Sequence, residues 1–299
     1  MCIRDRGRVI RSTFGLGHGS GAASSRWFWH HQLKKPFFGR FMKPWRWPAG
    51  VATEGWDRVT IESASGSPLA AILKLAPQGR GVVVCAHPMG LAAKGFWLRN
   101  GHADALLEAG FHVLAFDFNG FGESPSTTFE YPLDMLAAGQ WARRSFAGLP
   151  VHALCASFGS LHALSAIDDP AFPYDSVVAE GCPPTLPQFW KAYPFPYAVL
   201  QASRFIAPAG ERRIRPVAHL PRAKPGVPLL LIHSHGDSWT PVAFGDEIEK
   251  AVPATTPLTR LVLDKADHTH GMRDERERYW PAVLAFLEET QERLRVQGT

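Results

Sequence analysis

A chain of 299 residues with 45% hydrophobic and 11% aromatic residues can bury a large core, which excludes a disordered or fibrous protein. Its four cysteines lack the spacing of a metal or C-x-x-C redox site, and the longest uncharged stretch is too polar for a membrane span. The net charge of +5 comes from the N-terminal segment, because residues 1–50 hold ten Lys and Arg against one acidic residue.

The N-terminal segment begins with a Gly- and Ser-rich stretch, residues 1–25, that has no hydrophobic periodicity. This composition predicts a disordered tail, which we place outside the folded domain. No apolar run follows the basic start, which argues against a secretory signal. We therefore expect a cytoplasmic protein.

The N-terminal segment that follows, residues 26–55, differs in kind, because aromatic and basic residues alternate over residues 26–48. The aromatic residues are Trp27, Phe28, Trp29, Phe37, Phe38, Phe41, Trp45 and Trp47, and the basic ones include Lys34, Lys35, Arg40, Lys43 and Arg46. Prolines and a glycine interrupt any long amphipathic helix, so the simplest interpretation is a flap whose rings pack on the domain while its cations stay in water. The alternative is peripheral contact with an anionic membrane. Nucleic-acid binding is not expected, because the rest of the chain is acidic and offers no extended basic groove.

From about residue 56 the pattern becomes regular and predicts alternating strands and helices. The predicted strands are Asp57–Glu62, Leu69–Leu75, Gly81–His87, His112–Phe118, Val151–Ser157, Ser176–Cys182, Pro228–His233 and Arg260–Leu263. The predicted helices are Leu98–Ala109, Leu133–Ala147, Phe158–Ile167, Ala243–Ala251 and Glu275–Arg293. This alternation indicates an α/β domain over residues 56–299 with a mostly parallel eight-stranded sheet covered by helices on both faces.

Ligand sites of such sheets lie beyond the carboxyl ends of the strands. The predicted strands end in or lead into AHPMG, DFNGFGES, CASFG, HGDSWTP and ADHTHG, in chain order. With these motifs, residues 56–295 resemble the α/β-hydrolase fold, in which Ser157, Asp237 and His268 occur in the usual order of nucleophile, acid and histidine. The resemblance implies a serine hydrolase of the esterase, lipase or thioesterase kind.

Each of the three residue types suits acyl transfer on chemical grounds. A serine hydroxyl is a weak nucleophile until a base removes its proton, and a sharp strand-to-helix turn would expose Ser157 to an imidazole. His268 is the predicted general base, and Asp237 would fix its tautomer and stabilise the imidazolium. The resemblance further implies an oxyanion hole formed by the backbone N–H groups of Met89 and Phe158.

Three alternatives stay open for these roles. Cys155 stands where the family pattern usually has glycine, and its thiol could be the nucleophile instead of Ser157. His270 lies two residues after His268 and could be the base. Glu180, at the end of the sixth strand, could be the acid, since some members of the fold place it there. A further possibility is that Ser157 is only a buried structural serine.

The turn DFNGFGES is similar to the family pattern D-x-R-G-x-G-x-S, with Asn119 where arginine is common. We interpret Asp117, Gly120 and Gly122 as the scaffold of this loop. Its glycines do not match a nucleotide-binding motif. We therefore expect no cofactor and no metal.

The substrate class is less clear from the sequence. Residues 183–227, between the sixth and seventh strands, are long enough for a small lid. Aromatic residues gather at the start of this segment, where they either line an apolar acyl pocket or cover the sheet edge: Phe189, Trp190, Tyr193, Phe195 and Tyr197. The resulting prediction is a carboxylesterase-like enzyme that cleaves small-molecule esters or thioesters with an apolar group. The alternatives are an amidase or peptidase, an acyltransferase, and a catalytically silent scaffold that binds lipid or a partner.

Overall fold

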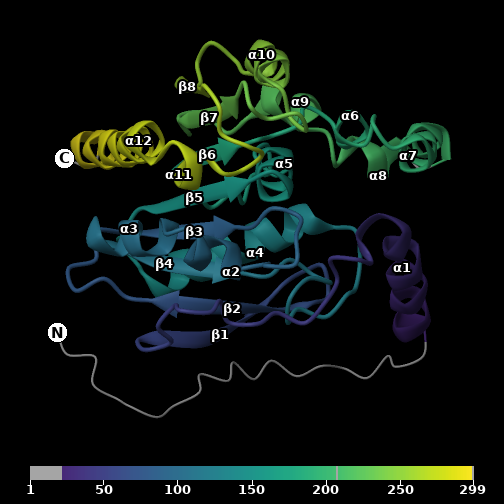
Figure 1. Ribbon diagram of the computed structural model, residues 1–299, viewed down its shortest axis with the longest axis horizontal. Helices are drawn as coiled ribbons and strands as arrows, with labels where there is room; N and C mark the ends of the chain where they lie inside the picture. Colours follow the sequence, from purple (N-terminus) through teal and green to yellow (C-terminus); the bar gives the residue numbers. More distant parts are fainter. Residues whose placement is uncertain (1–21, 207, 298–299) are drawn as a thin grey trace.

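The computed structural model describes the backbone of residues 22–206 and 208–297 and the side chains from residue 29 onward (Figure 1). The predicted tail therefore lies outside the described residues as far as residue 21. Residues 22–25, which the sequence placed in that tail, are already helical. In the part of the chain that the structure describes, no helix combines the length and apolar character needed to cross a membrane.

One eight-stranded sheet forms the centre of the molecule, in the strand order β1-β2-β4-β3-β5-β6-β7-β8. The strands are β1 (Trp56–Glu62), β2 (Pro68–Lys74), β3 (Gly81–Ala86), β4 (Phe111–Phe116), β5 (Val151–Ala156), β6 (Ser176–Glu180), β7 (Leu229–Ser234) and β8 (Leu258–Leu263). β2 is antiparallel to both β1 and β4, and every other neighbouring pair is parallel. The predicted mostly parallel α/β sheet is confirmed.

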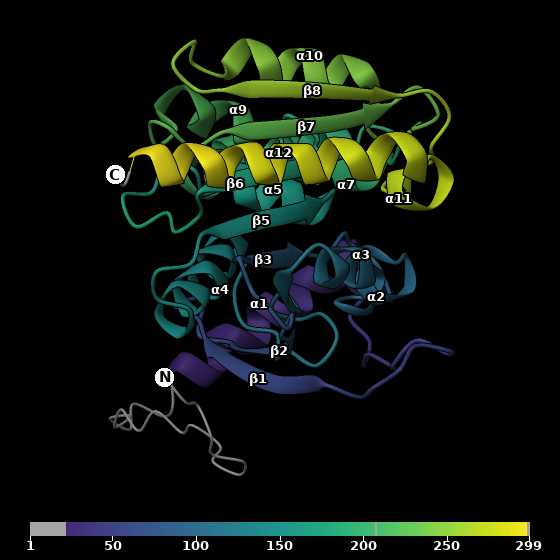
Figure 2. The same ribbon diagram turned by 90° about the vertical axis from the view of Figure 1, so that its left-hand side faces the viewer.

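Helices connect and cover the strands (Figures 1 and 2). The helices are α1 (Ala22–Phe38), α2 (Gly95–Arg99), α3 (His102–Glu108), α4 (Tyr131–Ser145), α5 (Phe158–Ser165), α6 (Leu186–Phe189), α7 (Pro194–Ile206), α8 (Pro208–Arg212), α9 (Pro216–His219), α10 (Val242–Ala251), α11 (Gly271–Asp274) and α12 (Arg276–Gln297). One predicted helix is corrected: Leu98–Ala109 is divided into α2 and α3, because Gly101 between them adopts a φ of 77°.

The core has two layers, because successive side chains of a strand point to opposite faces of the sheet. In β3, Val82, Val84 and Ala86 pack with residues of α4 and α5, whereas Val83 and Cys85 pack with residues of α2, α3 and α12. Figure 2 shows α12 lying across the second of these faces. Covering both faces explains why the central strands are apolar along their whole length.

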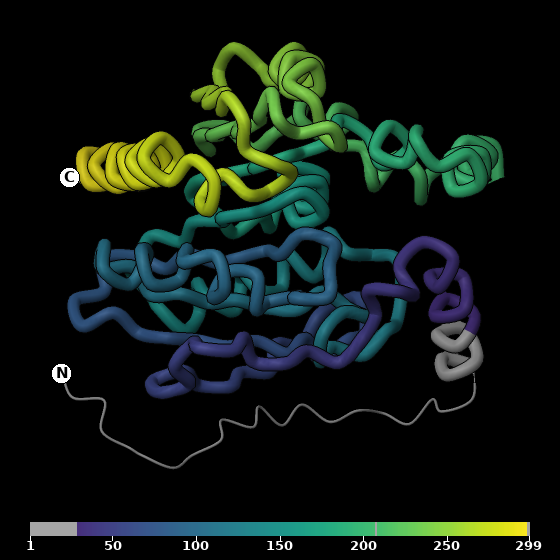
Figure 3. The backbone as a smooth tube through the Cα atoms, in the orientation of Figure 1, coloured from purple at the N-terminus to yellow at the C-terminus, as the bar shows by residue number. Residues whose placement is uncertain are grey.

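Helix α1 and the insertion that follows β6 lie at the same end of the molecule (Figure 3). The insertion contains α6 to α9 and corresponds to the predicted lid segment. Phe37 of α1 contacts Trp190 of the insertion, with ring centroids 6.0 Å apart. The N-terminal segment is thus joined to the lid segment by packing.

The flap interpretation of residues 26–48 is correct for most of the described rings and wrong for one cation. Phe38 and Trp45 are buried, and Trp47 packs on the core edge. Lys34, expected in water, is fully buried because it finds hydrogen-bond partners beneath α1. Trp29 keeps 65% of its surface exposed, and the membrane contact of this segment stays a prediction.

Candidate active site

Ser157 occupies the sharp turn between β5 and α5. Its φ of 48° and ψ of −103° lie in a region that non-glycine residues rarely adopt. The turn is held by the Ser157 N–H, which donates to the Glu180 carbonyl at 2.8 Å. It also needs Gly159, because a Cβ atom there would lie 2.1 Å from the Ala86 carbonyl oxygen. The strained turn aims the hydroxyl beyond the carboxyl end of β5.

The structure explains why Cys155 can stand where the family pattern usually has glycine. Cys155 is still within β5 and pairs with Ala86 and Ala179 on the neighbouring strands, so its backbone does not require glycine. The thiol is fully buried, and burial raises its pKa well above the ordinary value. A buried thiol that resists ionisation is a poor nucleophile, so these findings argue against Cys155 in that role.

The structure brings Ser157, His268 and Asp237 into one hydrogen-bonded row. The distance from Ser157 Oγ to His268 Nε2 is 2.8 Å, and the distance from His268 Nδ1 to Asp237 Oδ2 is 2.7 Å. Asp237 belongs to the loop after β7, and His268 to the loop after β8. Three separate strand ends therefore place a hydroxyl, an imidazole and a carboxylate within direct hydrogen-bonding reach.

Asp237 is fixed by its own loop. Its Oδ1 accepts hydrogen bonds from the N–H groups of Trp239 and Thr240 at 2.8 and 2.9 Å, and its Oδ2 accepts from Thr240 Oγ1 at 2.5 Å. Burial alone would raise the pKa of Asp237, but the hydrogen bonds from His268 and Thr240 hold it below its ordinary value. The carboxylate is therefore charged at neutral pH and oriented toward His268.

The two alternative residues occupy other places. His270 makes no side-chain hydrogen bond to Ser157 or Asp237, and burial lowers its pKa. Glu180 accepts from the Gly271 N–H at 2.9 Å and from the Tyr279 hydroxyl at 3.1 Å, and burial raises its pKa to about 7. It thus binds the loop that carries the histidine, and does not bond to the imidazole itself.

The two predicted oxyanion donors lie beside Ser157. Phe158 begins α5, and Met89 lies in the loop after β3. Within the described part of the chain, neither backbone N–H donates to another protein group. Met89, Ser157 and Phe158 also line one pocket, and the oxyanion role of the two N–H groups stays a prediction.

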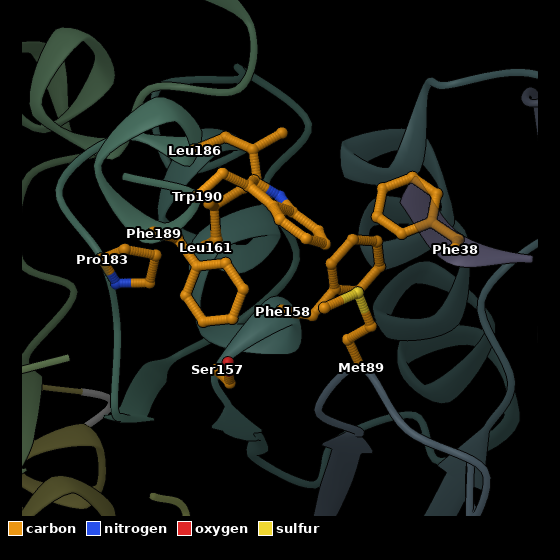
Figure 4. Close-up of a pocket in the computed structure, with 9 residues that line it drawn as sticks. All are labelled: Phe38, Met89, Ser157, Phe158, Leu161, Pro183, Leu186, Phe189 and Trp190. Carbon is orange, nitrogen blue, oxygen red and sulfur yellow. The ribbon is translucent and has the colours of Figure 1, made fainter. Parts of the chain in front are cut away.

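That pocket is apolar and narrow (Figure 4). Besides Ser157 its lining consists of Phe38, Met89, Phe158, Leu161, Pro183, Leu186, Phe189 and Trp190. Of the five lid aromatics, Phe189 and Trp190 line this pocket, Tyr193 and Phe195 are exposed, and Tyr197 is half-buried outside the pocket lining. The free volume is about 10 Å³, roughly what one water molecule requires.

Comparison with known proteins bears on the fold. No family model matches the sequence, and no curated protein matches it significantly. Among solved structures, the Pyrococcus furiosus esterase Pf2001 is 21% identical, with a TM-score of 0.66 over 83% of this chain and 97% of that chain. The esterase domain of a Rhodothermus marinus protein is 20% identical, with a TM-score of 0.56 over 79% and 98%. Porphyromonas gingivalis dipeptidyl peptidase 4 is 14% identical, with a TM-score of 0.60 over 78% and 35%.

These likenesses and the strand order establish the architecture. The chain has the α/β-hydrolase fold. Because the identities are low, the likenesses establish the fold alone. Within the described residues, no group of three or more His, Cys, Asp or Glu side chains is placed to hold a metal ion.

Sequence reasoning missed three residues that support the candidate site in this α/β-hydrolase fold. Thr240 bonds to Asp237, and its Oγ1 lies 3.2 Å from His268 Nδ1; the motif D-S-W-T-P contained that signal. Lys94 is fully buried and forms an ion pair with Asp117, which supports the scaffold role expected for Asp117. Lys34 bonds to Asn119 from α1, and no local pattern pointed to it.

Proposed function

We propose that the protein is a serine hydrolase that cleaves carboxylic esters or thioesters with an apolar group through an acyl-Ser157 intermediate. The observation that carries this proposal is the row of hydrogen bonds from Ser157 through His268 to Asp237 at the carboxyl ends of three parallel strands. The empty apolar space beside Ser157 supports an uncharged acyl group.

In the acylation step, Ser157 Oγ attacks the substrate carbonyl carbon while its proton passes to His268 Nε2. Asp237 accepts the Nδ1–H hydrogen bond and stabilises the imidazolium. The N–H groups of Met89 and Phe158 donate to the oxyanion of the tetrahedral intermediate. The bond to the leaving oxygen or sulfur then breaks, and His268 returns the proton to that atom, which leaves the acyl group on Ser157.

Deacylation uses the same groups, with water as the nucleophile and Ser157 Oγ as the leaving group. A water molecule attacks the acyl carbon while His268 Nε2 takes one of its protons. When the second tetrahedral intermediate breaks down, the acid leaves and Ser157 Oγ recovers the proton from His268. The same atoms would serve an amidase, a peptidase or an acyltransferase, because only the leaving group or the acceptor differs. The narrow apolar pocket favours a small ester or thioester as the substrate over an extended peptide.

A substrate screen tests the proposal. We expect the purified protein to hydrolyse p-nitrophenyl acetate and an acetyl thioester much faster than acetyl p-nitroanilide. The Ser157→Ala variant should lose turnover by about 10⁶-fold, as expected when the nucleophile of a serine triad is removed. Faster cleavage of the anilide than of the ester and thioester would indicate that the protein is an amidase. Turnover that survives in Ser157→Ala would exclude Ser157 as the nucleophile.

A further inference from the structure

The pocket beside Ser157 includes one residue from outside the hydrolase domain. Phe38, the last residue of α1, is 3% exposed and lines the pocket together with Met89 and Phe158. In Figure 4 its ring lies beyond Phe158 as seen from Ser157. The N-terminal segment therefore supplies part of the wall that an acyl group would contact.

The ring of Phe38 is enclosed by other rings. Its centroid lies 5.7 Å from that of Phe158, 5.9 Å from that of Phe121 and 6.1 Å from that of Tyr131. The contacts with Phe158 and Tyr131 are edge-to-face, the arrangement that aromatic pairs prefer. Such packing leaves the Phe38 ring little freedom to turn away from the pocket.

One turn earlier, Lys34 anchors α1 to the domain. Its ammonium group donates to the side chain of Asn119, and Asn119 Nδ2 donates to Asp134 Oδ2 at 2.8 Å. The ammonium group also lies 4.7 Å from the centre of the Tyr131 ring. Burial lowers the pKa of Lys34 to about 7, although the negative charge of Asp134 acts in the other direction and raises it. A lysine removed from water in this way requires its partners, so the network holds the helix in one position.

The other side of the helix end is held by the lid. Phe37 packs edge-to-face on Trp190 at 6.0 Å, and Trp190 itself lines the pocket. Phe37 is not part of the pocket lining. The two neighbouring phenylalanines therefore have separate tasks: Phe38 borders the acyl space, and Phe37 joins α1 to the lid segment.

We propose that Phe38 limits the size of the acyl group, so that the preferred substrates are esters or thioesters of short-chain acids such as acetate and propionate. This inference rests on the function proposed above. The cavity volume is small, about 10 Å³, and Phe38 forms part of its wall beyond Phe158, where the end of a lengthening acyl chain would meet the ring. Removing the Phe38 ring would open the pocket for additional methylene groups, which are stabilised when they leave water.

The test compares kcat/KM for p-nitrophenyl acetate, butanoate and hexanoate in the wild type and in variants of the full chain. We expect the wild type to prefer acetate. In Phe38→Ala the ratio of hexanoate to acetate should rise by at least about tenfold, since one methylene in an apolar pocket changes selectivity by about 10- to 200-fold. Phe38→Leu should raise the ratio in the same direction and less. Phe37→Ala, the matched control on the same turn, should leave it near the wild-type value.

The results separate the two proposals. If the wild type hydrolyses acetate and the ratio is the same in all variants, or if Phe37→Ala raises it as much as Phe38→Ala, the size limit does not come from Phe38. A wild type that prefers hexanoate would also overturn the inference. If the wild type hydrolyses none of the esters, the proposed ester function fails first. Phe38→Leu keeps the test decisive if Phe38→Ala does not fold, because leucine still fills part of the buried site.

Discussion

His268→Ala is expected to reduce kcat/KM for p-nitrophenyl acetate by about 10⁴- to 10⁶-fold, because alanine cannot take the proton from Ser157 or return it to the leaving group. The distance of 2.8 Å between His268 Nε2 and Ser157 Oγ is short enough for direct proton transfer between them. Steady-state kinetics at pH 8 with at least micromolar enzyme would measure a loss of this size.

The matched control is His270→Ala, two residues along the same loop. We expect it to retain activity within about tenfold, since the His270 side chain makes no hydrogen bond to Ser157 or Asp237. Thermal unfolding followed by circular dichroism would show whether both variants are folded. A large loss in His270→Ala together with an active His268→Ala would transfer the role of base to His270.

Asp237→Asn is the second large expected effect, a loss of about 10⁴-fold in kcat. The asparagine oxygen can still accept from the N–H groups of Trp239 and Thr240, so the loop is preserved. Its amide nitrogen would face His268 Nδ1 as a donor, which forces the imidazole into the wrong tautomer for accepting the Ser157 proton.

The matched substitution is Glu180→Gln, which tests the other candidate acid. Glutamine keeps an oxygen that can accept from the Gly271 N–H, so we expect kcat to fall by no more than about tenfold. Comparable losses in Asp237→Asn and Glu180→Gln would mean that both carboxylates support the imidazole. A larger loss in Glu180→Gln would reverse the assignment.

The central sheet was predictable from the sequence because its strands are continuous apolar runs bounded by turn residues. All eight predicted strands are present, and the ends of β5, β7 and β8 carry Ser157, Asp237 and the histidine loop. The parallel arrangement then decides that these ends meet at one edge of the sheet. The apolar pattern of the strands and the parallel topology together were enough to predict the three candidate residues.

The helix boundaries and the structure of the N-terminal segment were harder to predict from the sequence. The division of α2 from α3 depends on one glycine with positive φ, which the apolar pattern does not reveal. The helix α1 forms in spite of Pro36 in its last turn. It is held by packing partners that lie more than 80 residues away, such as Asn119 and Phe158. Tertiary contacts of this range leave no periodic signal in the segment itself.

Buried charge was the feature that sequence reasoning misjudged most. Lys34 lies in a basic stretch and was expected to be solvated, yet it is fully buried. Lys94, which received no role, is also fully buried in an ion pair with Asp117. A lysine is buried only where particular acceptors surround it. The positions of those acceptors are a property of the assembled fold.

Both steps of the proposed reaction require Ser157 to be an activated nucleophile, and labelling with a fluorophosphonate probe tests this most directly. The purified full-length protein would be treated with the probe, digested and mapped by mass spectrometry, with Ser157→Ala as the control. We expect a single adduct on Ser157 and none in the variant. A folded wild-type protein that forms no adduct, or forms one elsewhere, would contradict the account, and the absence of any adduct would favour a catalytically silent scaffold.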